Sequence, residues 1–400
     1  MNNSLLTLLI LIIMPAVLNG KEFTKYKISY LFIENDIRYE KWGVHPVDIR
    51  SRERNRKRPI DGAKLAIKET EKFKRLSKTI FNLNLIKVNG KEDLFNVVES
   101  KGFQNSKVIL LDLDDKQILR IKNVIKKNKD IIFFNISSSN NKLRKSLCIK
   151  NFFHTYPSDR MLTDAISQYA TERKWNKALI LTGPLKTDVE FSQSFKSSAK
   201  NFGLKVVEEK FFVNNNDPRV RDKNDLKYLT QGRKYKTVFV SDVFGEFALK
   251  VSNATVYPAM VSGSAGLVPS AWHWSNMRYG SPQLNGRFER LYKRRMESRD
   301  WAAWAAVKTM LEAIVRTKNN NINILLEYIY SDLFKLDGSK GVALSYRTWS
   351  NQLRQPIFLV SNNNWITAKA PLESFSNRSN NLDTIGISKD EITCLSKDIK

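Results

Sequence analysis

The sequence predicts an α/β fold of two Rossmann-like lobes, each with a parallel β-sheet and flanking helices. Short runs rich in Ile, Val, Leu and Phe alternate with longer amphipathic stretches, and this alternation indicates parallel strands joined by crossover helices. The pattern occurs before Cys148 and again after it. The chain has 400 residues, of which 42% are hydrophobic, and this is enough apolar material for two cores.

The first lobe is expected to begin with a strand at Ile28–Ile33, followed by a helix at Asp61–Thr70. Further apolar runs and amphipathic stretches continue the same alternation towards Cys148. Later strands are expected at Leu83–Val88, Val108–Leu113 and Ile131–Ile136, with helices starting near Leu94 and near Gln117.

The second lobe is expected to begin with a helix at Ser158–Trp175, because the Ser158 hydroxyl is a good acceptor for an N-terminal backbone N–H. The buried strand Ala178–Thr182 runs into a Gly-Pro pair that ends it. The next helix, Val189–Phe202, should stop at Gly203, where a left-handed conformation costs little. Further strands are expected at Val206–Val213 and Thr237–Val240.

Beyond Met260 the sequence changes to small residues and tryptophans before strand and helix patterns return. The segment Arg38–Arg58, near the other end of the chain, has no clear period and predicts a surface loop. Helices are expected at Leu284–Glu297 and Arg299–Thr317, and strands at Gly341–Arg347 and Gln355–Val360.

The first residues resemble a secretory signal peptide at positions 1–20. Leu5–Leu18 is an almost uninterrupted apolar run that is too short to span a bilayer, and Gly20 is a small residue at the expected cleavage site. The usual positive charge near Met1 is missing, so an uncleaved anchor is the alternative. No cysteine follows the run at which a lipid could be attached, and we therefore expect an exported, soluble mature protein.

The chain is strongly basic, with a formal net charge of +27 at pH 7 and a dense cluster at Arg50–Arg58. Such a charge attracts polyanions and anionic membrane surfaces, which leaves a polyanion-binding or membrane-surface role as one alternative. Nucleic-acid binding would require a recognisable module or aromatic residues interleaved with the basic cluster, and neither occurs. We expect no nucleic-acid partner.

Cys148 and Cys394 are the two cysteines of the chain, and they form neither a metal-binding cluster nor a Cys-x-x-Cys pair. In an oxidising compartment they could form a disulfide, and closing so long a loop would stabilise the fold by roughly 4 to 5 kcal/mol in the chain-entropy model. Two unrelated buried thiols are the alternative.

Motifs for catalysis are absent from the sequence. The histidines, His45, His154 and His273, lack the spacing that holds a catalytic metal. Gly263–Gly266 does not have the spacing of a nucleophile elbow, and no phosphate-binding glycine motif occurs. We therefore expect no metal, no cofactor and no catalytic residue, and we do not expect an enzyme.

Acidic residues follow two of the predicted strands. Asp112, Asp114 and Asp115 end one strand, and Asp242 with Glu246 follows another. Ligands bind at the carboxyl ends of strands in open α/β sheets, which favours a binding role for these acids. Solvated turn acids and helix N-terminal charges are the alternative.

Trp272, His273 and Trp274 form the most unusual local group of the chain. Three large rings after a loop of small residues can line a cleft and stack against a flat or apolar ligand. Packing between the lobes is the alternative interpretation.

Four stretches carry a resemblance to a known family, Phe153–Ser158, Ser262–Trp274, Gln352–Pro356 and Leu382–Gly386. They resemble the ABC-transporter substrate-binding proteins associated with PQQ-dependent alcohol dehydrogenase systems. That family is a branch of the type I, leucine/isoleucine/valine-type periplasmic binding proteins. The resemblance extends from about Ile28 to Cys394.

The resemblance implies the Venus-flytrap architecture, in which three crossings join two lobes that close on a ligand. It also implies the disulfide between Cys148 and Cys394. The chain should cross near Phe153, Pro269 and Val342. The implied parts are 21–152 and 269–342 for lobe I, and 153–268 and 343–400 for lobe II and the tail.

Receptors of the leucine type bind the ligand with a Ser/Thr-rich loop after a lobe I strand and with an acid from lobe II. Glu69–Lys78 departs from the family pattern, which makes the transfer of the lobe I wall less secure. The residues that could form the site are Ser137, Ser138 and Asn140 in the loop, Asp188 or Asp242 as the acid, and Trp272 and Trp274.

The implied function is that of the periplasmic substrate-binding component of an ABC uptake transporter. Its partners would be a small-molecule ligand, an ABC permease in the inner membrane and a PQQ-dependent dehydrogenase. A non-transport accessory protein of a periplasmic quinoprotein dehydrogenase is the alternative, beside the polyanion-binding role. No chemical step is needed for any of these roles.

Overall fold

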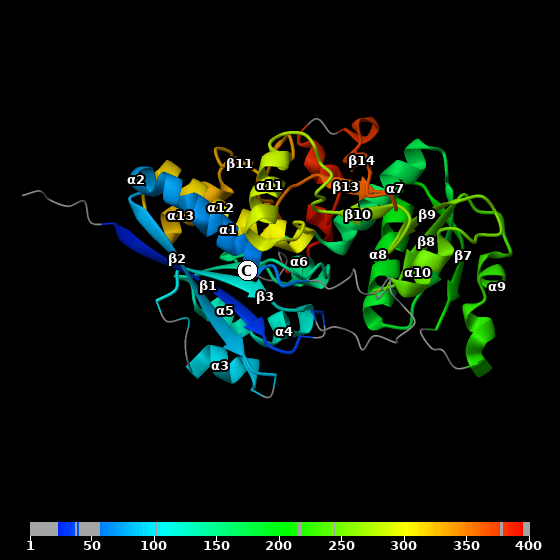
Figure 1. The fold of residues 1–400 in the computed structure, drawn as a ribbon, viewed down its shortest axis with the longest axis horizontal. Helices are drawn as coiled ribbons and strands as arrows, with labels where there is room; N and C mark the ends of the chain where they lie inside the picture. The colour runs from blue at the N-terminus through cyan, green and yellow to red at the C-terminus, as the bar shows by residue number, and fades with distance from the viewer. Residues whose placement is uncertain are drawn as a thin grey trace, which may run out of the picture.

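The chain folds into two halves that lie side by side, each with a parallel β-sheet of its own (Figure 1). The expected leader at 1–20 and most of the basic segment Arg38–Arg58 lie outside the described residues. The structure is a computed structural model, and it describes residues 23–36, 38–39, 57–90, 92–100, 103, 105–213, 218–243, 245–376 and 379–394.

The first lobe contains a five-stranded sheet in the order β2-β1-β3-β4-β5, in which neighbouring strands are parallel. Its strands are β1 (Thr24–Ile33), β2 (Thr79–Val88), β3 (Val108–Asp112), β4 (Ile132–Asn135) and β5 (Phe152–His154). Its helices are α1 (Ile60–Thr70), α2 (Lys74–Ser77), α3 (Leu94–Ser100), α4 (Asp115–Arg120), α5 (Lys122–Lys127), α6 (Lys142–Ser146), α11 (Ser281–Tyr292), α12 (Ser298–Thr317) and α13 (Ile322–Tyr330).

Apolar cores cover both faces of this sheet. Side chains alternate across a strand, so Ile28 of β1 packs with Trp301 of α12 on one face, and Leu31 packs with Ile118 of α4 on the other. Burial on both faces explains why these strands are continuous apolar runs in the sequence.

The second lobe contains a parallel four-stranded sheet in the order β7-β6-β8-β9. The side chain of Ser158 accepts the backbone N–H of Met161, which confirms Ser158 as the N-cap of the first helix of this lobe. The elements are β6 (Lys177–Thr182), β7 (Lys205–Phe211), β8 (Thr237–Ser241), β9 (Met260–Gly263), α7 (Asp159–Glu172), α8 (Lys186–Asn201), α9 (Leu226–Thr230) and α10 (Glu246–Val251).

Two smaller antiparallel sheets lie beside the segments that join the lobes. Ile357 and Leu359 belong to the core of the second lobe, whereas Tyr346 and Leu353 pack in the core of the first. The residues at which the chain changes lobe stay a prediction. The additional strands are β10 (Val268–Ser270), β13 (Ile357–Val360) and β14 (Ile366–Ala370) in one sheet, and β11 (Leu336–Asp337) and β12 (Ala343–Leu344) in the other.

Gly62 allows α1 to lie directly against the start of α12. A Cβ atom built at Gly62 would stand only 1.9 Å from the carbonyl oxygen of Asp300, so every larger residue would separate the two helices. Helix α12 begins at Ser298, and its position therefore depends on this contact.

Two of the expected elements are shorter in the structure. The helix expected at Leu284–Glu297 ends at Tyr292, because Lys293 adopts a left-handed conformation and caps it. Of the strand expected at Gly341–Arg347, only Ala343–Leu344 pairs in a sheet. Tyr346 packs in the core of the first lobe and forms an isolated bridge with Leu353 instead, and periodicity cannot separate these two causes of burial.

The C-terminal segment crosses back from the second lobe to the first. Ile385 packs in the second core, and the backbone N–H of Thr393 then donates to the carbonyl of Lys145 at the end of α6. A disulfide joins Cys148 to Cys394, with the two Cα atoms 6.0 Å apart. The tail is therefore attached covalently to the first lobe.

Removal of this disulfide should destabilise the protein. We expect Cys148→Ser to lower the free energy of unfolding by about 2 to 5 kcal/mol, because the bond restricts a very long loop in the unfolded chain. Cys394→Ser should have the same effect, and the double variant should cost no more than either. Denaturant unfolding with and without a reducing agent measures this, and a natural chain that is insensitive to reduction would contradict it.

Candidate functional site

The loop that follows β4 lies at the carboxyl end of the first sheet, where open α/β sheets bind their ligands. Asn135, the last residue of β4, is buried, and its side-chain oxygen accepts the backbone N–H groups of Ser137 at 3.3 Å and Ser138 at 2.9 Å. Its amide nitrogen donates to the carbonyl of Ser138 at 2.8 Å. The buried side-chain amide of Asn135 therefore fixes the conformation of the Ser137–Asn140 loop.

Arg144 in α6 attaches this loop to the segments that join the lobes. Its guanidinium donates to the carbonyls of Ser138 at 2.8 Å and Asn140 at 3.0 Å. It also donates to the carbonyl of Tyr156 at 2.7 Å and to Oε1 of Gln352 at 3.0 Å. Arg144 is buried, and burial lowers the pKa of its guanidinium to about 9.

Asn140 is the point where the loop contacts the second lobe. Its amide nitrogen donates to Asp115 of α4 at 2.9 Å and to Glu190 of α8 at 3.0 Å. The amine of Lys142 also donates to Glu190, at 3.3 Å. The loop after β4 and the start of α6 therefore contact the second lobe through polar groups.

Asp159 at the start of α7 lies close to this contact. Its backbone N–H donates to the carbonyl of Ser139 at 2.8 Å. Burial raises the pKa of its carboxyl group to about 7, and the negative charges of Glu190 and Asp115 act in the same direction. Arg144 and the Ser139 hydroxyl oppose this rise without cancelling it.

Asp112, at the end of β3, is the centre of a group of polar side chains at the carboxyl edge of the first sheet, which we call the first-lobe wall. It is fully buried, and it accepts the hydroxyl groups of Tyr30 at 2.8 Å and Tyr39 at 2.7 Å. Arg38 and Arg58 form ion pairs with it at 3.5 Å and 3.4 Å. A single buried carboxylate thus contacts side chains that lie between 54 and 82 residues away from it in the sequence.

Arg38 connects this carboxylate to the loop after β4. Its guanidinium donates to both oxygens of Asp36, with the shortest distance 2.6 Å, and to the hydroxyl of Ser137 at 3.0 Å. The Ser137 hydroxyl donates in turn to the carbonyl of Leu113 at 3.1 Å. Charged hydrogen bonds of this kind hold the wall in one arrangement.

Arg299, the second residue of α12, completes the wall. Its Nε atom donates to the carbonyl of Ser137 at 3.3 Å, and its guanidinium lies 5.8 Å from the ring centre of Tyr39 and 5.6 Å from that of Tyr156. The side chain is half-buried, and no carboxylate of the described residues lies within ion-pair distance of it. We call Arg38, Arg58 and Arg299 the arginine cluster.

The two acids expected from the second lobe are held by backbone groups. Asp188 is buried in the first turn of α8, where its oxygens accept the N–H groups of Leu185 at 3.1 Å and Val243 at 2.7 Å. Burial raises the pKa of Asp188 to about 6, and the nearby charge of Asp242 adds to the rise. Asp242 accepts the N–H of Ala248 at 3.0 Å, and its Oδ1 atom is buried without a partner among the described residues.

The two tryptophans lie in different environments. Trp272 is 1% exposed, and it stacks on Trp301 in the first core with ring centres 6.1 Å apart. Trp274 is half-buried, and the guanidinium of Arg295 lies 3.4 Å from its ring centre. Trp272 therefore packs within the core of the first lobe and not between the lobes, while Trp274 keeps part of its surface in solvent.

Among the expected site residues, the structure brings together Ser137, Ser138 and Asn140, because they share one loop. Asp188 and Asp242 form a separate pair, linked through Val243, in the second lobe. Sequence reasoning missed the arginine cluster. The unusual concentration of arginines in the Arg38–Arg58 segment was the available signal, and it was attributed to a surface loop.

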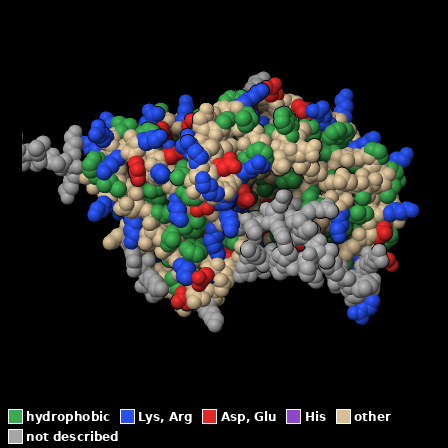
Figure 2. Space-filling model, viewed as in Figure 1, with side chains coloured by type: hydrophobic (Ala, Val, Ile, Leu, Met, Phe, Trp, Pro, Cys, Tyr) green, Lys and Arg blue, Asp and Glu red, His purple; other side chains and the backbone are tan. Residues whose placement is uncertain are grey.

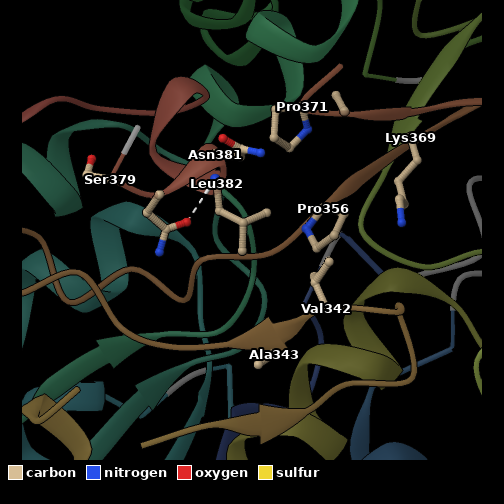
Figure 3. Close-up of a pocket in the computed structure, with 10 residues that line it drawn as sticks. Val342, Ala343, Pro356, Lys369, Pro371, Ser379, Asn381 and Leu382 are labelled. Carbon is tan, nitrogen blue, oxygen red and sulfur yellow. Dashed lines mark hydrogen bonds between the residues drawn. The ribbon is translucent and has the colours of Figure 1, made fainter. Parts of the chain in front are cut away.

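A concave surface of another kind lies beside the segments that join the lobes (Figure 3). This pocket has a volume of about 380 Å³, and its walls are mainly apolar, with Val342, Pro356 and Leu382 among them. Lys369 of β14 provides an amine at its edge (Figure 3). None of the residues expected from the sequence to bind the ligand lines this pocket.

Basic side chains are also abundant outside the cluster. Figure 2 shows Lys and Arg side chains spread over the visible face of both lobes, without one concentrated patch. The local positive charge beside Ser137 is therefore distinct from the general basic character of the chain.

None of the helices within the described ranges has the length and apolarity needed to cross a membrane.

Two lobes, each with a parallel sheet and flanking helices, give the fold of type I periplasmic binding proteins. A branched-chain amino acid ABC transporter periplasmic ligand-binding protein from Burkholderia xenovorans matches with a TM-score of 0.66 at 10% identity, over 86% of this chain and 95% of that chain. An ABC transporter substrate-binding protein from Desulfitobacterium hafniense in complex with Leu matches with a TM-score of 0.62 at 14% identity, over 86% and 99%.

A solute-binding protein of an ABC transporter from R. palustris, in complex with benzoate, also matches, with a TM-score of 0.62 at 10% identity over 86% and 95% of the two chains. No protein-family model matches the sequence, and no curated protein matches it. The likeness to ABC transporter substrate-binding proteins of the leucine/isoleucine/valine-binding type therefore rests on the fold.

Replacement of Arg144 by methionine should destabilise the protein by about 3 kcal/mol or more, because several buried carbonyls would lose their donor. Urea unfolding of Arg144→Met measures the loss. Arg316→Met is the control, since Arg316 lies on the surface of α12 and pairs with Glu312; it should change the free energy of unfolding by less than about 0.5 kcal/mol. Equal losses in the two variants would show that Arg144 does not hold the loop.

The Asp159 carboxyl group should make stability depend on pH. Its folded-state pKa of about 7 lies above its ordinary value of 3.8, so over this range the unfolded chain loses the proton while the folded chain keeps it. The free energy of unfolding should therefore fall as pH rises through this window. Asp159→Asn should remove this slope, so that the variant gains most relative to the natural chain near neutral pH. Denaturant unfolding at a series of pH values measures it, and a pH-independent difference would contradict the assignment.

Proposed function

We propose that this chain is the substrate-binding component of an ABC uptake transporter and that it binds a small solute between its lobes. The observation that carries the proposal is the loop Ser137–Asn140, which lies at the ligand-binding edge of one sheet and contacts the second lobe through Asn140 and Glu190. The fold likeness to substrate-binding proteins of ABC transporters supports it.

Solute binding and delivery would require only an equilibrium between an open and a closed arrangement of the two lobes. A solute that contacts both lobes stabilises the closed arrangement over the open one, and the closed shape would be recognised by a membrane permease. Segments that join the lobes hold one another through buried amides, since Gln355 donates to the carbonyl of Thr155 at 2.8 Å and Gln352 donates to that of His154 at 3.0 Å. In this proposal, the lobes close about these segments.

The proposal has two further parts, which concern the cellular location of the protein and the metabolic process that it serves. Export to the periplasm is supported by the leader-like run Leu5–Leu18 and by the periplasmic neighbours of the fold. A link to PQQ-dependent alcohol oxidation is supported by the sequence resemblance alone. We include PQQ and short alcohols among the test compounds for this reason.

The proposal is tested with the chain from Lys21 onward and a panel of amino acids, organic acids, alcohols, methylated amines and PQQ. A ligand that binds only the folded protein raises its melting temperature by mass action, and closure of the lobes should lower the radius of gyration in solution scattering. We expect at least one compound to produce both effects in a saturable manner. A panel without any such compound would count against a transport role.

A further inference from the structure

The first-lobe wall carries one positive charge that nothing in the described structure neutralises. Arg38, Arg58 and Arg299 surround two carboxylates, Asp36 and Asp112. Both carboxylates are buried, and both are paired with Arg38. Three guanidinium groups against two carboxylates leave an excess of one positive charge at the edge of the sheet.

Arg299 is the member of the cluster that pairs with no carboxylate of the described residues. Its one hydrogen bond runs from Nε to the carbonyl of Ser137, so its two terminal nitrogens have no acceptor among the described residues. A half-buried guanidinium without a counter-ion is unfavourable, because it has lost part of its hydration without gaining an ion pair. A carboxylate fits these two parallel N–H groups in a bidentate manner.

The rings beside Arg299 indicate the rest of the ligand. Tyr39 and Tyr156 both lie beside the guanidinium, with ring centres within 6 Å of its carbon atom. Their faces offer flat apolar surface next to the charge. A compact acid with an aromatic or branched aliphatic body would bury that surface while its carboxylate pairs with Arg299.

The carboxylates of the site are already engaged, and this argues against a ligand with an ammonium group. Asp36 and Asp112 pair with arginines, and Asp188 accepts two backbone N–H groups. Asp115 and Glu190 accept the side-chain amide of Asn140, and Glu190 also pairs with Lys142. Asp242 retains one unpartnered oxygen, but this atom is enclosed and inaccessible to solvent. An amino acid would therefore bring its ammonium group to a wall that already has excess positive charge.

We propose that the cleft binds a small organic monocarboxylate that lacks an ammonium group, and that Arg299 pairs with its carboxylate. This inference rests on the proposed function, and it specifies the ligand class and a specificity-determining residue. A phosphate ester fits less well, because a second negative charge would exceed the single free charge of the wall. The solved neighbour that holds benzoate shows that the fold accommodates such an acid.

The experiment compares ligands that differ in one charged group. The pair 4-methylpentanoate and leucine differs only by the ammonium group, and the pair benzoate and benzamide differs only in the charge of the acid. Calorimetric titration of the chain from Lys21 onward should show an acid binding at least about tenfold more tightly than its partner. Tighter binding of leucine than of 4-methylpentanoate would overturn the proposal.

The residue assignment is tested with Arg299→Gln, which removes the charge and keeps most of the side-chain volume. We expect the affinity for the acid to fall by about 10- to 100-fold, with the affinity for benzamide unchanged. Arg299→Lys should show an intermediate loss, because it keeps the charge but not the paired N–H groups. The control Arg290→Gln changes an exposed arginine of α11 and should bind like the natural chain.

Failure of this inference can be told apart from failure of the proposed function. If another compound of the panel binds and closes the lobes while no acid does, the receptor role stands and the ligand class is wrong. If an acid binds equally well to Arg299→Gln, the class stands and the residue is wrong. If no compound binds the folded chain, the proposed function and this inference both fail. Melting of each variant without ligand checks that it is folded.

Discussion

The buried guanidinium of Arg144 is the contact on which the arrangement of the site depends. It donates to the loop after β4, to the carbonyl of Tyr156 and to the side chain of Gln352. A buried arginine that donates only to neutral acceptors is costly to remove, because each carbonyl would be left without a donor. The loop after β4 and the segments that contain Tyr156 and Gln352 are therefore held by the same side chain.

Two different kinds of positive charge occur in this protein. The lysines and arginines on the surface give the chain its net charge of +27, and water and salt screen their effect. Arg38, Arg58 and Arg299 instead face a buried carboxylate, Asp112, where the effective dielectric is low and a single excess charge has a large effect. The net charge of the chain therefore says little about the local charge beside Asp112, which three particular arginines set.

The fold was predictable to a large extent, and the site only in part. Continuous apolar strands, the N-cap Ser158 and the helix stop at Gly203 are local signals, because burial on both sheet faces and capping act over a few residues. Ser137, Ser138 and Asn140 were predictable for the same reason, since they follow a recognisable strand. Asp188 was recognised as an acid near a helix, but its engagement with two backbone N–H groups depends on the exact position of Val243.

By itself, the sequence determined the class of fold, the two cores and the presence of a polar loop at a sheet edge, because these follow from periodicity and from the residue types at strand ends. Only the tertiary structure decided which charges share that edge. Arg38 and Ser137 are separated by 99 residues and Ser137 and Arg299 by 162, and they meet because three strand ends and the start of α12 converge. No local pattern encodes such a meeting, since it arises from the packing of whole elements, including the close approach of α1 and α12 at Gly62.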